Sequence, residues 1–288
     1  MTRSGDPRET ARRATTTTGV IGWPVDASLS PTIHNAAFRA AGLDWVYVPL
    51  PVAPHALADA LAGLAALGFA GANVTMPHKT EAASRMEVLS EEAELLRAVN
   101  TVVVAPEGLV GHNTDAPGFD RFLREDLAFD PAGATALVYG AGGAARACVL
   151  ALARGGAERI VVAVRDRARA AEVEALAAAV GAPARVVALA EAPTVDADLL
   201  VNATPVGAAG DRLPLPRLGD GVLVVDLLYR PSLTPLLEEA RAAGAAAANG
   251  LGLLLHQAAL SSELWTGQPP SIDVMSAAAV AALAERPG

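Results

Sequence analysis

A glycine-rich turn, GAGGAA at residues 140–145, constrains the fold of this chain more than any other feature. It follows a strand-like apolar run, ATALVYG, and leads into a helical pattern and a second apolar run, ERIVVAVR. Gly140 permits a tight turn, Gly142 lets backbone amides approach a pyrophosphate, and Ala145 permits close packing of the helix on the strand. The helix N-terminus adds partial positive charge beneath bound phosphates. The segment therefore predicts a dinucleotide-binding unit, with an ordinary strand-to-helix turn as the alternative.

The end of the second strand in this unit bears on the type of dinucleotide. NAD-binding sites usually place Asp or Glu there to bind the ribose 2′-hydroxyl, whereas arginine suits the 2′-phosphate of NADP. Val164 and Arg165 stand where the acid is expected, and Arg169 follows closely. This favours NADP. Asp166 leaves NAD open, and the alternative for both arginines is that they are ordinary surface cations.

Strand-like runs alternate with helical patterns along the rest of the chain. From Gly19 the strand-like runs are GVIGWPV, WVYVPLPV and GFAGANVT, and the segments between them space apolar residues three and four apart. This alternation implies parallel strands joined by helices. The segment NTVVVAPEGLVGHNTD predicts a hairpin that turns at residues 106–108. Further strand candidates are RVVAL, DLLVNAT, GVLVVDLLY and AAAAN, followed by two helices, LGLLLHQAALSSELWTG and SIDVMSAAAVAALAE.

Composition narrows the class of protein. With 288 residues the chain is long enough for two domains or one large one. The alternation of strands and helices predicts two α/β domains, of which the second is doubly wound. A net charge of −9 argues against nucleic acid or an anionic membrane as a partner. The single cysteine, Cys148, excludes an intrachain disulfide and is expected to be buried. Residues 1–18 are polar and are expected to form a disordered tail, and the chain is expected to be cytoplasmic.

The stretch NVTMPHK, residues 73–79, places a lysine in an unfavourable position. Pro77 suits the first turn of a helix, so we expect a strand, a turn at Met76-Pro77, and His78 and Lys79 at the start of a helix. The positive end of the helix dipole disfavours a cation there. Taken alone, Lys79 is more simply a solvated surface residue.

Several stretches together resemble the shikimate dehydrogenase family of the aromatic amino-acid pathway, in order and approximate spacing. They are SLSP (28–31), NVTMPHK (73–79), AVNT (98–101), NTDAPGF (113–119), GAGGAA (140–145), NAT (202–204) and NGLGLLLHQA (249–258). The resemblance implies an α/β fold with an N-terminal substrate-binding domain, residues 19–115 completed by helices in 252–288. It also implies a Rossmann NADP-binding domain, residues 116–251, with the substrate cleft between the two. The implied reaction is the reversible reduction of 3-dehydroshikimate to shikimate by NADPH.

The resemblance also implies the residues of the site. Lys79 is the expected catalytic lysine and Asp115 its partner carboxylate. The residues expected to bind the substrate are Ser28, Ser30, Thr75, Asn100, Asp115, Tyr229 and Gln257. The residues expected to bind the cofactor are Gly140, Ala141, Gly142, Gly143, Ala144, Arg165, Arg169, Thr204 and Gly250.

The chemistry of these side chains agrees with such a reaction. A dehydrogenase must move a proton at the oxygen while hydride moves at carbon, and a lysine facing a carboxylate can do this without zinc. The one cysteine and five scattered histidines form no pattern with zinc-ligand spacing. A small anion with many hydroxyls is bound well by hydroxyl, amide and carboxylate side chains.

Simpler roles exist for several of these residues. Ser28 or Ser30 could cap the helix that begins near Pro31, residues 113–115 could cap another helix, and Gln257 could be a satisfied core amide. The chain also departs from the family pattern at Ala27, where many members carry histidine, and at His78, where others carry phenylalanine. In place of the frequent Asn-Arg-Thr after the second Rossmann strand it has residues 164–166, Val-Arg-Asp.

Two other functions remain open from the sequence. One is a quinate/shikimate dehydrogenase of the same fold that uses NAD, and the other is a catalytically silent metabolite-binding regulator. The presence of both Lys79 and Asp115 speaks against a regulator, which needs binding groups but no proton relay. The expected partner is a small-molecule substrate, with neither nucleic acid nor membrane, and a homodimer is left open.

Overall fold

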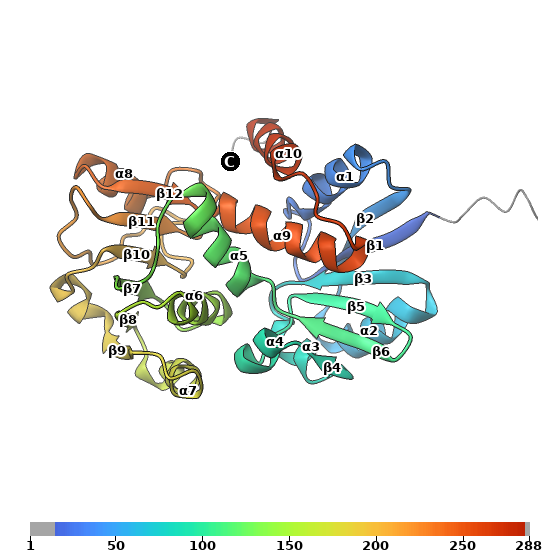
Figure 1. The fold of residues 1–288 in the computed structure, drawn as a ribbon, viewed down its shortest axis with the longest axis horizontal. Helices are drawn as coiled ribbons and strands as arrows, with labels where there is room; N and C mark the ends of the chain where they lie inside the picture. The colour runs from blue at the N-terminus through green and yellow to red at the C-terminus, as the bar shows by residue number, and fades with distance from the viewer. Residues whose placement is uncertain (1–14, 286–288) are drawn as a thin grey trace, which may run out of the picture.

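Two six-stranded sheets, formed by successive parts of the chain, organise the protein (Figure 1). The computed structural model describes residues 15–285, apart from the side chain of Arg169. The strands of the first sheet are β1 (Thr16–Gly22), β2 (Trp45–Pro51), β3 (Phe69–Val74), β4 (Val88–Leu89), β5 (Thr101–Ala105) and β6 (Gly108–His112). Those of the second are β7 (Thr135–Tyr139), β8 (Arg159–Val164), β9 (Ala184–Ala188), β10 (Leu199–Asn202), β11 (Leu223–Asp226) and β12 (Ala246–Asn249).

Ten α-helices connect and cover the strands in the described part of the chain. They are α1 (Ser30–Ala40), α2 (Leu57–Ala66), α3 (Lys79–Ala83), α4 (Glu91–Leu96), α5 (Asp115–Arg121), α6 (Gly143–Arg154), α7 (Ala171–Ala179), α8 (Pro235–Ala242), α9 (Leu251–Thr266) and α10 (Ile272–Glu285). Four shorter helical segments are η1 (Pro54–Ala56), η2 (Phe122–Asp126), η3 (Arg167–Ala170) and η4 (Leu189–Thr194). None of the helices within residues 15–285 combines the length and apolarity needed to cross a membrane.

The first sheet is mixed, with the order β2-β1-β3-β5-β6-β4. β1 pairs in parallel with both β2 and β3, as the alternating pattern predicts. β5 and β6 form the expected antiparallel hairpin, in which Ala105 faces Gly108 across a two-residue turn. β3 pairs antiparallel with β5, and at the far edge of the sheet the short β4 pairs in parallel with β6.

The start of β1 corrects the expectation of a disordered tail through residue 18. Thr16 already pairs with Trp45 of β2, and the side chain of Thr18 is fully buried. Threonine is β-branched and suits a strand, and here the neighbouring strands β2 and β3 supply pairing partners that composition alone does not reveal. The rest of the expected tail, residues 1–14, lies outside the described residues.

The second sheet is parallel throughout, with the order β12-β11-β10-β7-β8-β9. The chain starts at the central strand β7, proceeds outward to β9, and then returns to β10 on the other side of β7. This is the doubly wound order of a Rossmann fold, in which ligands bind beyond the carboxyl ends of the strands where the winding reverses. The expected fold class is therefore confirmed.

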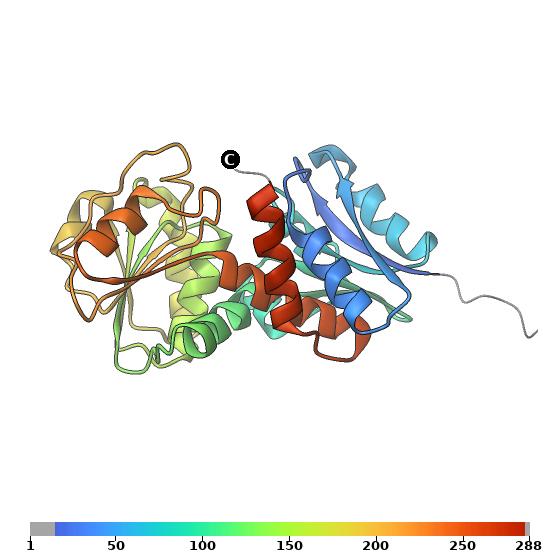
Figure 2. The same cartoon turned by 90° about the horizontal axis from the view of Figure 1, so that it is seen from above.

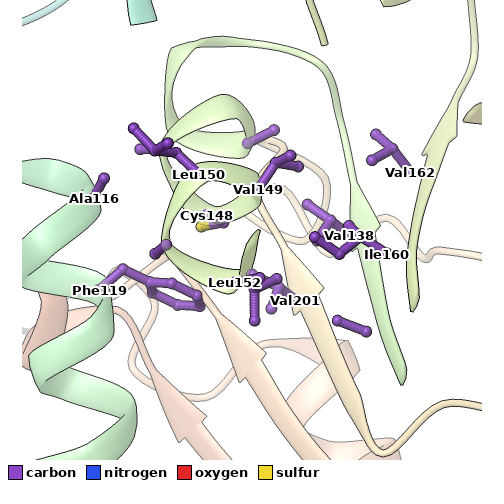
Figure 3. Close-up of a cluster of buried hydrophobic side chains, with 14 of the residues drawn as sticks. Ala116, Phe119, Val138, Cys148, Val149, Leu150, Leu152, Ile160, Val162 and Val201 are labelled. Carbon is purple, nitrogen blue, oxygen red and sulfur yellow. The ribbon is translucent and has the colours of Figure 1, made fainter. Parts of the chain in front are cut away.

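Helices cover both faces of the second sheet, and their apolar side chains pack against those of the strands to form the core. On one face α6 packs against the strands, and Figure 3 shows Cys148 of α6 among Val138, Ile160 and Val201. Phe119 of α5 joins the same cluster. α5 is therefore anchored to the second lobe, the part of the molecule built on the second sheet, as the first lobe is built on the first sheet. Cys148 is fully buried, as expected, and burial raises the pKa of its thiol.

The last two helices return the chain to the first lobe. α9 starts beside the second sheet, packs against α5 between the lobes, and reaches β3 and β5 (Figures 1 and 2). α10 then lies against α1 at the edge of the first lobe (Figure 2). The close contact of α5 and α9 depends on Gly118, where an added Cβ would lie 2.9 Å from the backbone nitrogen of Gln257. The two helices thus fix the side chains that face the space between the sheets.

Candidate active site

A pocket of about 480 Å³ is lined by residues of both lobes and of α9. Its volume is within the range of roughly 300–1,000 Å³ usual for small-molecule sites. All of the residues expected to act on or bind the substrate line it: Ser28, Ser30, Thr75, Lys79, Asn100, Asp115, Tyr229 and Gln257. Residues from five of the quoted motifs, together with Tyr229, therefore meet in one pocket.

Lys79 is the first residue of α3, as the NVTMPHK stretch predicts. The preceding residue, His78, is buried, and its Nε2 lies 2.7 Å from the carbonyl oxygen of Val52. The carbonyl oxygen of Lys79 accepts a hydrogen bond from the backbone of Val99 at 2.9 Å. These contacts fix the backbone of a helix only five residues long and so fix the direction of the lysine.

The ammonium of Lys79 is paired with Asp115. Its Nζ lies 2.5 Å from Oδ2 of Asp115, and the side chains are 28% and 14% exposed. Asp115 is the first residue of α5, but that helix has no side-chain cap, so the capping alternative for this carboxylate does not hold. The carboxylate instead offsets the unfavourable position of a cation at the start of α3.

Asn100 holds the other oxygen of the same carboxylate. Its Nδ2 donates to Oδ1 of Asp115 at 2.8 Å, and its Oδ1 accepts from the backbone nitrogen of Thr114 at 2.8 Å. The amide is therefore oriented by Thr114, and the two oxygens of Asp115 have separate donors. Lys79 therefore lies at the wall of the pocket, and Asp115, which is itself held by Asn100, sets the orientation of its ammonium.

A buried polar network beneath Asn100 was not anticipated from the sequence. Nδ2 of Asn73 lies 3.0 Å from both the carbonyl oxygen of Asn100 and Oγ of Ser261, and its Oδ1 accepts from the Tyr47 hydroxyl at 2.7 Å. Ser261 lies four residues after Gln257 on α9, on the same face of the helix. An asparagine inside an apolar strand was the available signal, because a buried amide requires partners.

The other residues expected to bind the substrate have few competing partners. The Oγ of Ser28 accepts from the backbone of Ser30 at 3.2 Å, whereas α1 begins without a side-chain cap, so capping by Ser30 is not observed. Gln257 donates to the carbonyl oxygen of Leu254 at 2.8 Å, and its Oε1 lies 3.5 Å from Nδ2 of Asn100. Burial raises the pKa of Tyr229, so its hydroxyl stays protonated and able to donate.

Lys79 is also the only lysine in the chain, in which all other cationic side chains apart from histidine are arginines. A guanidinium keeps its proton at any ordinary pH, whereas an ammonium can give its proton up. A lone lysine among arginines was therefore a sequence signal for proton transfer at this position.

The glycine turn lies at the carboxyl end of β7, next to the point where the winding of the second sheet reverses. Gly140 has φ +105°, and a Cβ there would lie 3.0 Å from Cγ2 of Thr204. A Cβ at Gly142 or Gly143 would meet no atom within 4 Å, so this side of the turn is open. The first turn of α6 carries no acidic residue and no side-chain cap. The turn therefore fits a pyrophosphate, whose oxygens can accept from the free backbone amides.

The residues expected near the 2′-phosphate lie at the end of β8. Arg165 directly follows the strand and is exposed. Asp166 accepts a hydrogen bond from the backbone of Ala168 at 2.9 Å, and Arg169 lies in η3, with a side chain outside the described part. Gly250 lines the pocket itself, and an added Cβ there would collide with the carbonyl oxygen of Leu227. The binding roles of these residues remain predictions.

Two family models match the chain. They describe a shikimate dehydrogenase substrate binding domain, over residues 20–102, and a shikimate 5′-dehydrogenase C-terminal domain, over residues 250–280. The NADP(+) shikimate dehydrogenase of Geobacter metallireducens is 46% identical over 274 residues, 92% of this chain and 96% of that one.

Solved structures of similar proteins also match this chain along nearly its whole length. Shikimate 5-dehydrogenase of Thermus thermophilus, in complex with NADP(H) and shikimate, is 39% identical with a TM-score of 0.83, covering 93% of this chain and 100% of that one. Quinate dehydrogenase of Corynebacterium glutamicum, in complex with NAD, is 32% identical with a TM-score of 0.86, covering 93% and 99%. Similarity of this extent covers both sheets and the pocket between them.

Proposed function

Because the chain belongs to the shikimate dehydrogenase family, we propose that its pocket carries out the family's reaction through Lys79 and Asp115. The chain is an oxidoreductase that reversibly reduces 3-dehydroshikimate to shikimate with NADPH. The observation that carries the assignment of residues is the 2.5 Å pair of Lys79 and Asp115 in the wall of the pocket.

In reduction, the Lys79 ammonium donates a proton to the carbonyl oxygen of the substrate, and in oxidation the neutral amine accepts the proton of the substrate hydroxyl. Asp115 orients the lysine and stabilises its charged form. NADPH, when bound, supplies the hydride that reduces the carbonyl carbon. The proton and the hydride together account for the two hydrogens gained by the ketone.

The polar groups around the pair hold the rest of the substrate. We assign the carboxylate to Ser28 and Ser30 and the ring hydroxyls to Thr75, Asn100 and Gln257, with Tyr229 at the border of the site. These assignments rest on family motifs and on the shared pocket. Asn100 supports them further, because its orientation is fixed by Thr114 and by Asp115.

The cofactor is NADP, with its pyrophosphate on the glycine turn. The open space at Gly142 and Gly143 and the uncapped start of α6 support this position. Arg165 and Arg169 are proposed for the 2′-phosphate and Thr204 and Gly250 for other parts of the cofactor. In this proposal residues 116–251 hold NADP, and residues 19–115 with 252–288, extended at the start by the first residues of β1, hold the substrate.

An assay of the purified chain with shikimate and quinate, each against NADP and NAD, tests this function. We expect the highest kcat/KM with shikimate and NADP. A preference for quinate and NAD would move the chain towards the activity named for its Corynebacterium glutamicum neighbour, and a silent regulator would show no turnover with any of the four pairs. The relatives named as NADP-dependent favour neither alternative.

Cellular location and assembly are further proposals. A cytoplasmic location is supported by the fully buried lone thiol, which requires no oxidising compartment. A homodimer stays open and is tested by light scattering at several protein concentrations.

A further inference from the structure

A second pocket, of about 450 Å³, adjoins the first. It lies where the segment after β11 faces α1 and α10, and its lining includes Arg230, Pro31 and Ala282. Val25, Asp26 and Ser28 line both pockets, so the two adjoin along the segment that carries Ser28. A side chain in the second pocket is therefore close to the carboxylate end proposed for the substrate.

Arg230 presents an unsatisfied charge in this second pocket. Its Nε and Nη2 are buried and have no hydrogen-bond partner. Within residues 15–285, Arg230 also has no carboxylate within 4 Å, although Asp26 and Glu285 line the same pocket. Two nitrogens of this guanidinium therefore lie away from water without an acceptor, which is costly because they lose hydrogen bonds to water and gain none from the protein. By contrast, the buried Arg146 forms an ion pair with Glu172.

The neighbours of Arg230 indicate what the missing partner is. Arg230 directly follows Tyr229, which lines the substrate pocket, and shares the second pocket with Ser28. The positive charge of Arg230 reaches Tyr229, since it partly counteracts the rise in the pKa of that phenol caused by burial. The lining of the second pocket includes Ser28, which is assigned to the substrate, and none of the residues assigned to the cofactor.

We propose that Arg230 is a specificity-determining residue that binds the carboxylate of the substrate together with Ser28. This inference rests on the proposed function. A guanidinium suits the task because it can donate paired hydrogen bonds to both oxygens of a carboxylate. The carboxylate would supply the counter-charge that Arg230 lacks, so substrates without one would gain nothing from this residue.

The test compares Arg230→Gln with the wild type, using shikimate and its carboxamide analogue. A hydrogen bond to a charged group corresponds to roughly 10–100-fold in affinity. We expect R230Q to raise KM for shikimate by about that factor, with kcat within about threefold and KM for NADP unchanged. For the carboxamide, KM should be the same in both proteins. Arg241→Gln, an exposed arginine on α8, is the matched control and should change none of these values.

Three results would overturn the proposal: an unchanged KM for shikimate, an equal change for the acid and the carboxamide, or a rise confined to KM for NADP. The wild type in the same assay separates this test from that of the proposed function, because a wild type that does not oxidise shikimate would refute the function itself.

Thermal unfolding supplies a readout apart from turnover. Since R230Q removes an unpaired charge, its Tm without ligand should not fall, whereas the rise in Tm caused by shikimate should shrink.

Discussion

Oδ2 of Asp115 lies 2.5 Å from Nζ of Lys79, and Oδ1 of the same carboxylate accepts from Asn100 at 2.8 Å. The carboxylate thus connects Lys79, the proposed catalytic residue, to the amide of Asn100, which we propose binds the substrate. Groups that act as one unit have strongly non-additive effects on turnover, so the pair should respond to substitution as a whole.

Asp115→Asn keeps the shape of the side chain but removes the charge beside Lys79. We expect kcat for shikimate oxidation to fall by about 10²-fold or more, because the lysine loses its orienting partner. The double variant Lys79→Met/Asp115→Asn should be no slower than Lys79→Met alone. Asp120→Asn, on the same helix but exposed and paired with Arg124, should retain wild-type turnover. An Asp115→Asn enzyme as fast as the wild type would limit Asp115 to a structural role.

Gly142→Ala separates cofactor binding from folding. The φ of Gly142 is −75° and a Cβ there meets no protein atom within 4 Å, so the free energy of unfolding should change little. The added methyl group would occupy the space proposed for the pyrophosphate, so KM for NADP should rise by an order of magnitude or more while KM for shikimate changes less. Equal KM values for NADP in the variant and the wild type would remove the pyrophosphate from this turn.

Replacing Arg165 and Arg169 together with alanine tests the basis of cofactor choice. The 2′-phosphate carries nearly two negative charges, and each charged hydrogen bond corresponds to roughly 10–100-fold in affinity. We expect a strong rise in KM for NADP and nearly unchanged, weak use of NAD. Arg185→Ala, an exposed arginine on β9, is the control. Equal losses with both cofactors would refute the proposed role of the two arginines.

Because His34 is buried in the first lobe, we expect the free energy of unfolding to depend on pH. Burial lowers its pKa from 6.5 to about 3, and its ring stacks on Tyr47 at 4.3 Å. Below pH 6.5 His34 binds a proton in the unfolded chain but not in the folded chain. The contribution of His34 to the free energy of unfolding is therefore fully present above pH 6.5 and is lost as the pH drops towards 3. His34→Phe should reduce this slope in urea unfolding by up to one proton, whereas His55→Gln, at an exposed site, should not. An unchanged slope in His34→Phe would show that His34 is charged or exposed in solution.

Much of the site could be predicted from the sequence, because its motifs are local. Pro77, two residues before Lys79, lies in the turn that precedes α3, and the glycine turn precedes α6, so the starts of both helices follow from short segments. β4 could not be predicted in this way, because it has only two residues and is a strand only through its pairing with β6.

The supporting network could not be predicted either. Asn73 and Ser261 are separated by 188 positions in the sequence, and only the packing of α9 on β3 brings them within 3.0 Å. The unpaired guanidinium of Arg230 is likewise a property of the folded chain. Nothing in its local sequence distinguishes it from the other arginines.

The central claim is that Lys79 transfers a proton, and Lys79→Arg tests it most directly. The variant keeps a positive charge that can still pair with Asp115, but a guanidinium does not give up its proton. We therefore expect kcat for shikimate oxidation by NADP to fall by about 10²–10⁴-fold, with KM for shikimate changed much less. A variant with nearly wild-type kcat and a raised KM alone would show that Lys79 binds the substrate and transfers no proton.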